Sequence, residues 1–260
     1  MAAPALRPRS PSEIVDAAFQ IMRAHYGPLV SCSAIAYVPL LLIKLLVVGN
    51  PLRFLGGPLD AIPTDLVWST GIALLGGWLT FAVMSAVLLV CTSQAYLGDE
   101  VDVAAAVRLA FSRLPLVLVA ALIRFLLMVL AFILMAFPVL YVVALLFAVT
   151  PVIVLERSGV LAAMRRSASL SKGRKWHILN TLGLVAIIYY VLLIGFSLIA
   201  SLLGDFVVST IVAAMVTVLV YPVVAITETL LYYDARIRTE GFDIELMMGA
   251  LEPSPSPTAS

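Results

Sequence analysis

Long apolar runs alternate with short polar segments along this chain, and their length predicts helices that cross a membrane. Residues 66–98 and 125–155 contain no acidic or basic side chain, and residues 176–204 contain only His177. A helix that rises about 1.5 Å per residue needs about 20 residues to cross a hydrocarbon core about 30 Å thick. Each of these runs is therefore long enough for a crossing.

The apolar runs divide into six predicted spans. As a single helix the block 115–155 would be roughly 60 Å long, about twice the thickness of the hydrocarbon core. A turn near Ala136-Phe137-Pro138 divides it, because proline disfavours helical geometry in the residue before it. The sequence thus predicts an all-α, polytopic transmembrane helical bundle with spans at about 28–49, 67–97, 115–135, 138–155, 177–203 and 206–233.

Short amphipathic helices precede the first, third and fifth spans, so that one unit of a short helix and two spans repeats three times. The first opens with Ser10-Pro11-Ser12-Glu13, which is typical of a capping box. The others are expected at about 100–113 and at about 159–172, where Gly173 is a suitable stop. These helices either lie in the head-group plane or pack on the bundle as ordinary connectors.

Composition supports the membrane assignment. Of 260 residues, 63% are hydrophobic and 12% are charged, and the mean hydropathy is +1.12. Soluble domains are about half apolar and about a quarter charged. We therefore expect a transmembrane domain over residues 11–248, a flexible N-terminus at 1–10 and a disordered tail at 249–260. No cleavable signal peptide is expected, because the first apolar run starts only near Pro28.

The distribution of Lys and Arg predicts the orientation. With six spans and both termini in the cytosol, Arg53 is the only lysine or arginine in the external loops. This asymmetry follows the positive-inside rule. Merging the third and fourth spans would instead place the basic segment 157–175 outside, so six spans fit better.

Three charged residues fall within the predicted spans, and each has an energetic cost there of about 2.5–3.5 kcal/mol on insertion scales. Lys44 is expected near the outer interface, where its side chain can snorkel. Arg124 and Glu228 lie roughly 13 Å and roughly 8 Å from the inner ends of their spans. We hypothesise an Arg124–Glu228 ion pair, either as a structural link or as part of a polar pocket for a lipid head group or a proton relay.

A basic cluster follows the fourth span. It either fixes the topology or binds anionic lipid head groups, at about 1 kcal/mol per basic residue, and both roles are compatible. Membrane lipids are thus the expected partners, with a membrane protein as a further possibility and no nucleic acid. The cluster consists of Arg165, Arg166, Lys172, Arg174 and Lys175.

Residues typical of enzyme active sites are sparse. His25 and His177 are the only histidines, and no HExxH, GxSxG, Walker-type loop or CxxC motif occurs. Cys32 and Cys91 lie in apolar segments, where we interpret them as buried hydrophobic residues rather than as a disulfide or a metal site. The sequence therefore favours a protein without cofactor, metal or catalytic activity.

Three stretches carry a family resemblance: SEIVDAAFQIMRAHYGPL, PVIVLERSGVLAAMRRSASLSKGRKW and LLYYDARIRTEGFDIELM. Their arrangement resembles the bacterial membrane domain that is fused to some glycerophosphoryl diester phosphodiesterases and its stand-alone relatives. The resemblance implies a multi-pass protein of the bacterial cytoplasmic membrane. It does not imply phosphodiesterase activity, because catalysis in the fused proteins belongs to a soluble barrel domain that these stretches do not include.

The matched polar motifs predict a collar of salt bridges at the inner face. We expect Glu156 to pair with Arg165 or Arg166, and Asp234 and Arg236 to act similarly on the last helix. The leading hypothesis is a non-enzymatic module that organises lipids or a partner protein. The alternatives are a small transporter with a polar path that includes Arg124 and Glu228, and a membrane-bound enzyme of lipid metabolism.

Overall fold

The computed structural model describes residues 9–48, 64–134, 136–202 and 206–240 and is helical through nearly all of them. The predictions for the first eight residues, for the loop 49–63 and for the tail 249–260 concern parts of the chain outside this range. The elements are α1 Pro11–Ala24, α2 Tyr26–Ile43, a π-helical turn η1 Lys44–Val48, α3 Thr64–Leu97, α4 Val103–Leu134, α5 Ala136–Leu145, α6 Val149–Leu155, α7 Val160–Leu170, α8 Lys175–Ser201 and α9 Phe206–Glu240.

Six helical stretches are long and apolar enough to cross a membrane, which confirms the predicted fold class. They overlap the six predicted spans, although the second begins at Leu75, the third begins at Val103 and the last continues beyond residue 233 to Glu240. The stretches are Tyr26–Leu46, Leu75–Leu97, Val103–Leu134, Pro138–Leu155, Lys175–Ser201 and Phe206–Glu240.

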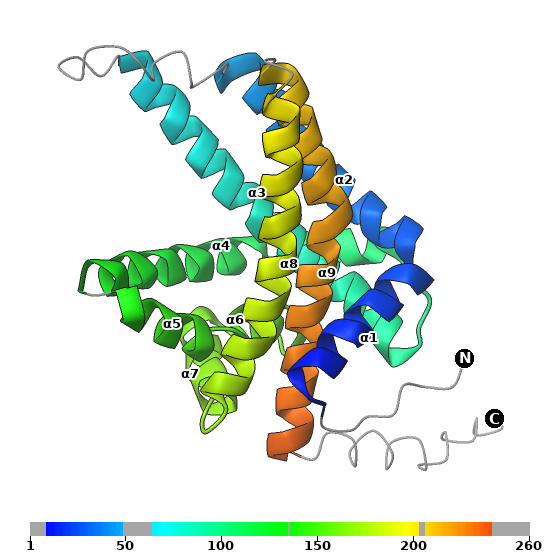
Figure 1. Ribbon diagram of the computed structural model, residues 1–260. Coiled ribbons are helices and arrows are strands. Elements are labelled where there is room, and N and C mark those ends of the chain that lie inside the picture. The colour runs from blue at the N-terminus through cyan, green and yellow to red at the C-terminus, as the bar shows by residue number, and fades with distance from the viewer. Residues whose placement is uncertain (1–8, 49–63, 135, 203–205, 241–260) are drawn as a thin grey trace, which may run out of the picture.

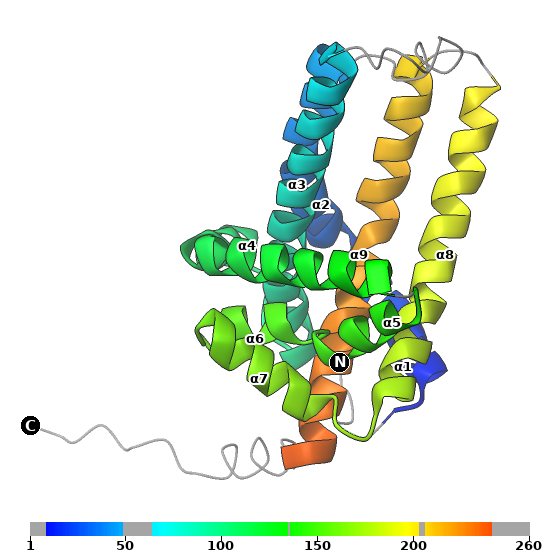
Figure 2. The same cartoon turned by 90° about the vertical axis from the view of Figure 1, so that its left-hand side faces the viewer.

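The helices do not all run in the same direction. In Figures 1 and 2, α2, α3, α8 and α9 extend along the length of the molecule, whereas α4 lies across them. The C-terminal end of α8 and the N-terminal end of α9 lie at the upper end of the views, and α1, α7 and the C-terminal end of α9 lie at the lower end. The third apolar stretch thus has the length of a span but crosses its neighbours.

The predicted short helix at 100–113 is not a separate element. It is the first part of α4, which continues through Pro115 to Leu134. A proline removes only one backbone hydrogen bond, and apolar surroundings preserve the remaining bonds because no water competes for them. The repeated unit of a short helix and two spans is therefore present in α1–α3 and α7–α9 but not in the middle of the chain.

The fourth predicted span is interrupted. Helix α5 ends at Leu145 and α6 begins at Val149, so that the backbone between them leaves the helical path. The Ser167 hydroxyl, from α7, donates to the Leu145 carbonyl (2.8 Å) and accepts from the Ala148 amide (3.0 Å). These bonds satisfy buried polar groups that an apolar environment would otherwise leave unpaired.

Helices α1 and α7 both pack on the bundle. The predicted capping box of α1 is confirmed, because Ser10 and Glu13 bond to each other's backbone amides. Helix α1 contacts α8 and α9 through an apolar face that includes the buried Ile14 and Met22. Helix α7 ends at Leu170, and Gly173 follows with a φ of 76°, a conformation that glycine adopts readily.

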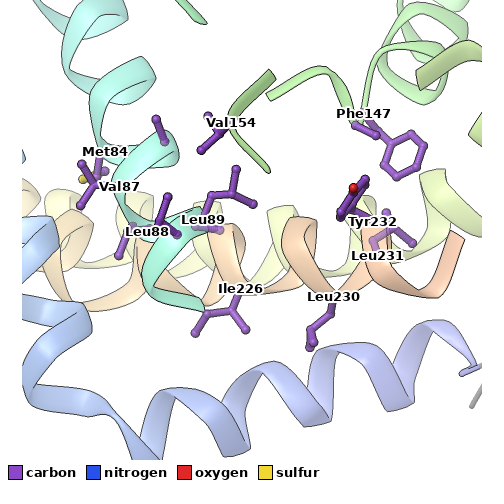
Figure 3. Packing of buried hydrophobic residues seen from close by; sticks show 14 of the residues in the cluster. Met84, Val87, Leu88, Leu89, Phe147, Val154, Ile226, Leu230, Leu231 and Tyr232 are labelled. Carbon is purple, nitrogen blue, oxygen red and sulfur yellow. The ribbon is translucent and has the colours of Figure 1, made fainter. Parts of the chain in front are cut away.

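The core surrounds the lower half of α9. Figure 3 shows Leu88 and Leu89 of α3 and Val154 of α6 beside Ile226 and Tyr232 of α9. Helix α9 has 35 residues and is about 50 Å long, which exceeds the hydrocarbon thickness. Its upper half exposes apolar side chains, as lipid-facing helices do. Its lower half is buried at the centre of the helices that surround it.

Candidate functional site

Arg124 and Glu228 line the same cavity. Arg124 comes from α4 and Glu228 from α9, and the cavity between them has a volume of about 670 Å³. Ligand pockets in proteins commonly measure about 300–1,000 Å³. The fold brings the two side chains to this cavity, although they are 104 positions apart in the sequence (228 minus 124).

The predicted direct ion pair between Arg124 and Glu228 is not formed. No nitrogen–oxygen contact within 4.0 Å joins them, and neither makes a hydrogen bond or ion pair with any other described residue. Both residues are partly buried and line the cavity, and no described side chain pairs with either charged group.

Aromatic side chains form much of the cavity wall. Phe81 of α3 and Tyr221 of α9 pack with their ring centroids 5.1 Å apart. Further polar groups are few, with hydroxyls from serine, threonine and tyrosine residues. The lining comprises Trp78, Phe81, Ala82, Ser85, Val117, Ala121, Arg124, Phe125, Met128, Thr150, Tyr190, Tyr221 and Glu228.

A second polar cluster joins α6, α7 and α9 at the lower end. Of the two predicted partners of Glu156, the structure selects Arg166, whose Nε lies 3.2 Å from Glu156 Oε2. Arg166 also pairs with Glu240, which in turn pairs with Arg236 at 3.2 Å. The buried Tyr232 hydroxyl donates to Glu156 Oε1 at 2.8 Å.

Arg166 lies between two carboxylates in this cluster. Hydrogen bonds and attraction from Glu240 and Glu156 raise the pKa of Arg166 above its ordinary value, against the opposing effect of partial burial. A guanidinium held by two carboxylates fixes three helices relative to one another, because its planar donors require a defined geometry. The cluster thus acts as a structural link at the end of the bundle.

Asp234 organises a neighbouring cluster. Its carboxylate accepts from the Arg238 Nε (2.8 Å) and from the backbone amide of Arg9 (2.8 Å). His177 Nε2 lies 3.4 Å from Asp234 Oδ2, but the geometry does not make a hydrogen bond. Asp234 is 4% exposed, so the positive groups around it compensate a buried negative charge.

The five residues of the predicted lipid-binding cluster fall into two groups. Arg166 belongs to the salt-bridge network, Arg174 donates to the Arg238 carbonyl at 3.0 Å, and Lys175 Nζ lies 3.9 Å from the Tyr141 ring centroid. The side chains of Arg165 and Lys172 are exposed and make no hydrogen bond or ion pair with the described residues. Only these last two side chains extend freely from the surface.

Several partners in these networks were not among the predicted residues. They are Glu240 and Arg238 on α9, Tyr232, the backbone of Arg9, and Ser167. One available signal was the spacing of Asp234 and Arg238, four residues apart on a helix, which favours pairing. The contacts from Arg9 and Ser167 join distant segments and have no local signal.

The two cysteines are free and buried, with their sulfur atoms 3.2 Å apart on α2 and α3. Across residues 9–48, 64–134, 136–202 and 206–240, no three His, Cys, Asp or Glu side chains form a group that could hold a metal ion.

Comparisons of this chain with protein-family models, with curated proteins and with solved structures give no match. The resemblance to the phosphodiesterase-associated membrane domain therefore stays a prediction.

Proposed function

We propose that this chain is a non-enzymatic membrane module that binds a phospholipid in the cavity between α3, α4, α8 and α9. The observation that carries the proposal is the pair of separated charges, Arg124 and Glu228, that face one cavity of about 670 Å³. Unpaired charges at this depth are costly and typically mark a binding site or pathway. A lipid head group would supply partners for them.

The proposed location is the bacterial cytoplasmic membrane, with both termini in the cytosol. Support comes from the lower end of the molecule, where α1, α7 and the C-terminal end of α9 lie. Arg166 is on α7, and Arg174 donates to the carbonyl of Arg238 on α9. Basic residues of this kind concentrate on the cytoplasmic side of membrane proteins.

Lipid retention tests the proposal. The protein is purified in mild detergent, and its bound phospholipid is extracted and quantified by mass spectrometry. We expect wild type to retain phospholipid. Arg124→Gln should lower retention by about tenfold or more, because a hydrogen bond to a charged group contributes about 1.5–3 kcal/mol.

Arg108→Gln is the matched control, since Arg108 lies exposed on the same helix and does not line the cavity. It should leave retention unchanged. Wild-type protein that retains no phospholipid, or equal losses in both variants, would contradict the proposal. Chemical conversion of the retained lipid would contradict the non-enzymatic part.

A small transporter is the second candidate. The observation that favours it is that Arg124 and Glu228, with opposite charges, face one cavity, as expected for a polar path. Reconstitution into liposomes separates the candidates: a transporter moves solute or lipid between the two sides, whereas a binding module only retains its ligand.

A further inference from the structure

The charges of the cavity define the chemistry of its occupant. Arg124 contributes one positive charge and Glu228 one negative charge, and they stand apart without another charged residue in the lining. An anionic head group would pair with Arg124 and leave Glu228 facing a like charge. A purely cationic ligand would leave Arg124 unpaired, which is costly in a poorly hydrated site.

We propose that the cavity recognises a zwitterionic head group that combines a phosphate with a primary ammonium, carried by an aminophospholipid such as phosphatidylethanolamine. The inference rests on the proposed function and specifies its ligand. Arg124 binds the phosphate, to which a guanidinium can donate two parallel hydrogen bonds. Glu228 accepts from the ammonium.

A carboxylate distinguishes primary from quaternary ammonium groups. A primary ammonium offers three N–H donors to Glu228, whereas the trimethylammonium of a choline head group has none. The aromatic wall, including Tyr221 and Phe81, suits either cation because ring faces attract positive charge. Discrimination between the two therefore depends on Glu228.

An apolar face of α8 beside the cavity fits the acyl chains. One side of this helix forms the face, with Gly183, Ala186, Ile187, Tyr190, Val191 and Ile194. Tyr190 belongs both to this face and to the lining of the charged cavity, so the two adjoin. A charged cavity that adjoins an exposed apolar face suits an amphiphile better than a small soluble zwitterion.

Competition among lipids with matched acyl chains tests the inference. Purified protein is incubated with an equimolar mixture of phosphatidylethanolamine, phosphatidylglycerol and phosphatidylcholine, and bound lipid is counted by native mass spectrometry. We expect wild type to prefer phosphatidylethanolamine by roughly tenfold or more over each competitor, which corresponds to about 1.4 kcal/mol or more, because each competitor leaves Arg124 or Glu228 without a partner of opposite charge that can form a hydrogen bond.

Glu228→Gln should still bind phospholipid but lose its preference for phosphatidylethanolamine over phosphatidylcholine. Arg124→Gln should weaken the binding of all three lipids, and Arg108→Gln should match wild type. The wild-type preference is itself a test that requires no variant to fold.

The outcomes separate the two proposals. Equal retention of the three lipids by wild type would overturn the zwitterion assignment while leaving the lipid-binding function intact. Retention of none would overturn the lipid-binding function. Soluble glycerophosphoethanolamine should compete poorly, because it lacks acyl chains; competition as strong as that of the lipid would overturn the assignment to a lipid.

Discussion

At the break between α5 and α6, the hydroxyl of Ser167 lies between two backbone groups that the helices leave unpaired. It donates to the Leu145 carbonyl and accepts from the Ala148 amide, and the Ser167 side chain is buried. Ser167→Ala leaves both groups unsatisfied and should lower the free energy of unfolding by about 1–3 kcal/mol. Denaturant-induced unfolding in detergent micelles measures the change.

Ser169→Ala is the control, because Ser169 lies on the same helix and its exposed hydroxyl donates only to the Arg166 carbonyl one turn earlier. Its effect should be small. Equal stability of the Ser167→Ala variant and wild type would mean that the break holds without this hydroxyl.

Removing one hydroxyl, that of Tyr232, tests how much the salt-bridge cluster stabilises the fold. Its hydroxyl donates to Glu156 while its ring is wholly buried, so Tyr232→Phe removes the hydrogen bond and preserves the packing. We expect a loss of about 1.5–3 kcal/mol in the free energy of unfolding, as for a bond to a charged acceptor.

Tyr96→Phe provides a matched comparison. Tyr96 is also buried in the core, but its hydroxyl makes no hydrogen bond to the described residues. A loss for Tyr96→Phe as large as that for Tyr232→Phe would show that the Tyr232–Glu156 bond does not stabilise the fold.

Among the elements, α4 departs most from the expected bundle. Its length and apolar composition indicate a span that ends at the outer surface, yet it lies across α8 and α9 in Figures 1 and 2. The apolar composition of a helix indicates that it is surrounded by lipid or by other apolar helices, but it does not indicate the direction of the helix. A helix that lies within one leaflet is as apolar as a helix that crosses the bilayer.

Cysteine accessibility measures the direction of α4. Ile133, 74% exposed, belongs to the last turn of α4, and Leu202, 86% exposed, directly follows α8. The C-terminal end of α4 lies far below the upper end in both views, whereas the C-terminal end of α8 lies at the upper end. A membrane-impermeant maleimide added outside should label Leu202→Cys and not Ile133→Cys. The native Cys32 and Cys91 are buried and provide an unreactive background.

Labelling of Ile133→Cys from outside, at a rate comparable to Leu202→Cys, would contradict the crossed arrangement. It would indicate that the third and fourth apolar stretches form a membrane-crossing hairpin.

The sequence predicted helices well where the signal was local. The α1 capping box and the Gly173 stop depend on neighbouring residues, and both are confirmed. Pro151 in the first turn of α6 was a local signal for the break after Leu145, but the hydrogen bonds that satisfy the broken backbone come from Ser167 in a later helix. Local patterns carry no information on such long-range contacts.

For the whole molecule, the sequence indicated the class of fold but not the arrangement of its site. It identified Arg124 and Glu228 as a pair of intramembrane charges, and the structure places both at one cavity. It predicted direct contact because depth along parallel spans was the only available measure. The structure instead places the two side chains at one cavity without direct contact, and helix periodicity does not encode this arrangement of α4.

The upper and lower parts of the molecule differ in the side chains that they bury and expose. The upper ends of α8 and α9 expose apolar surface, and Leu198 and Ile199 near the C-terminal end of α8 are examples. The lower part contains the core and the salt-bridge clusters. The charged cavity lies where α4 crosses between them. A head group in this position would face the polar lower end while its acyl chains follow α8.

A structure determined by electron cryomicroscopy in nanodiscs that contain phosphatidylethanolamine tests the central claim most directly. The account predicts density for one head group between Arg124 and Glu228, with acyl chains extending along α8 past Tyr190. A cavity closed by direct contact between the Arg124 guanidinium and the Glu228 carboxylate, with no lipid density between them, would contradict it.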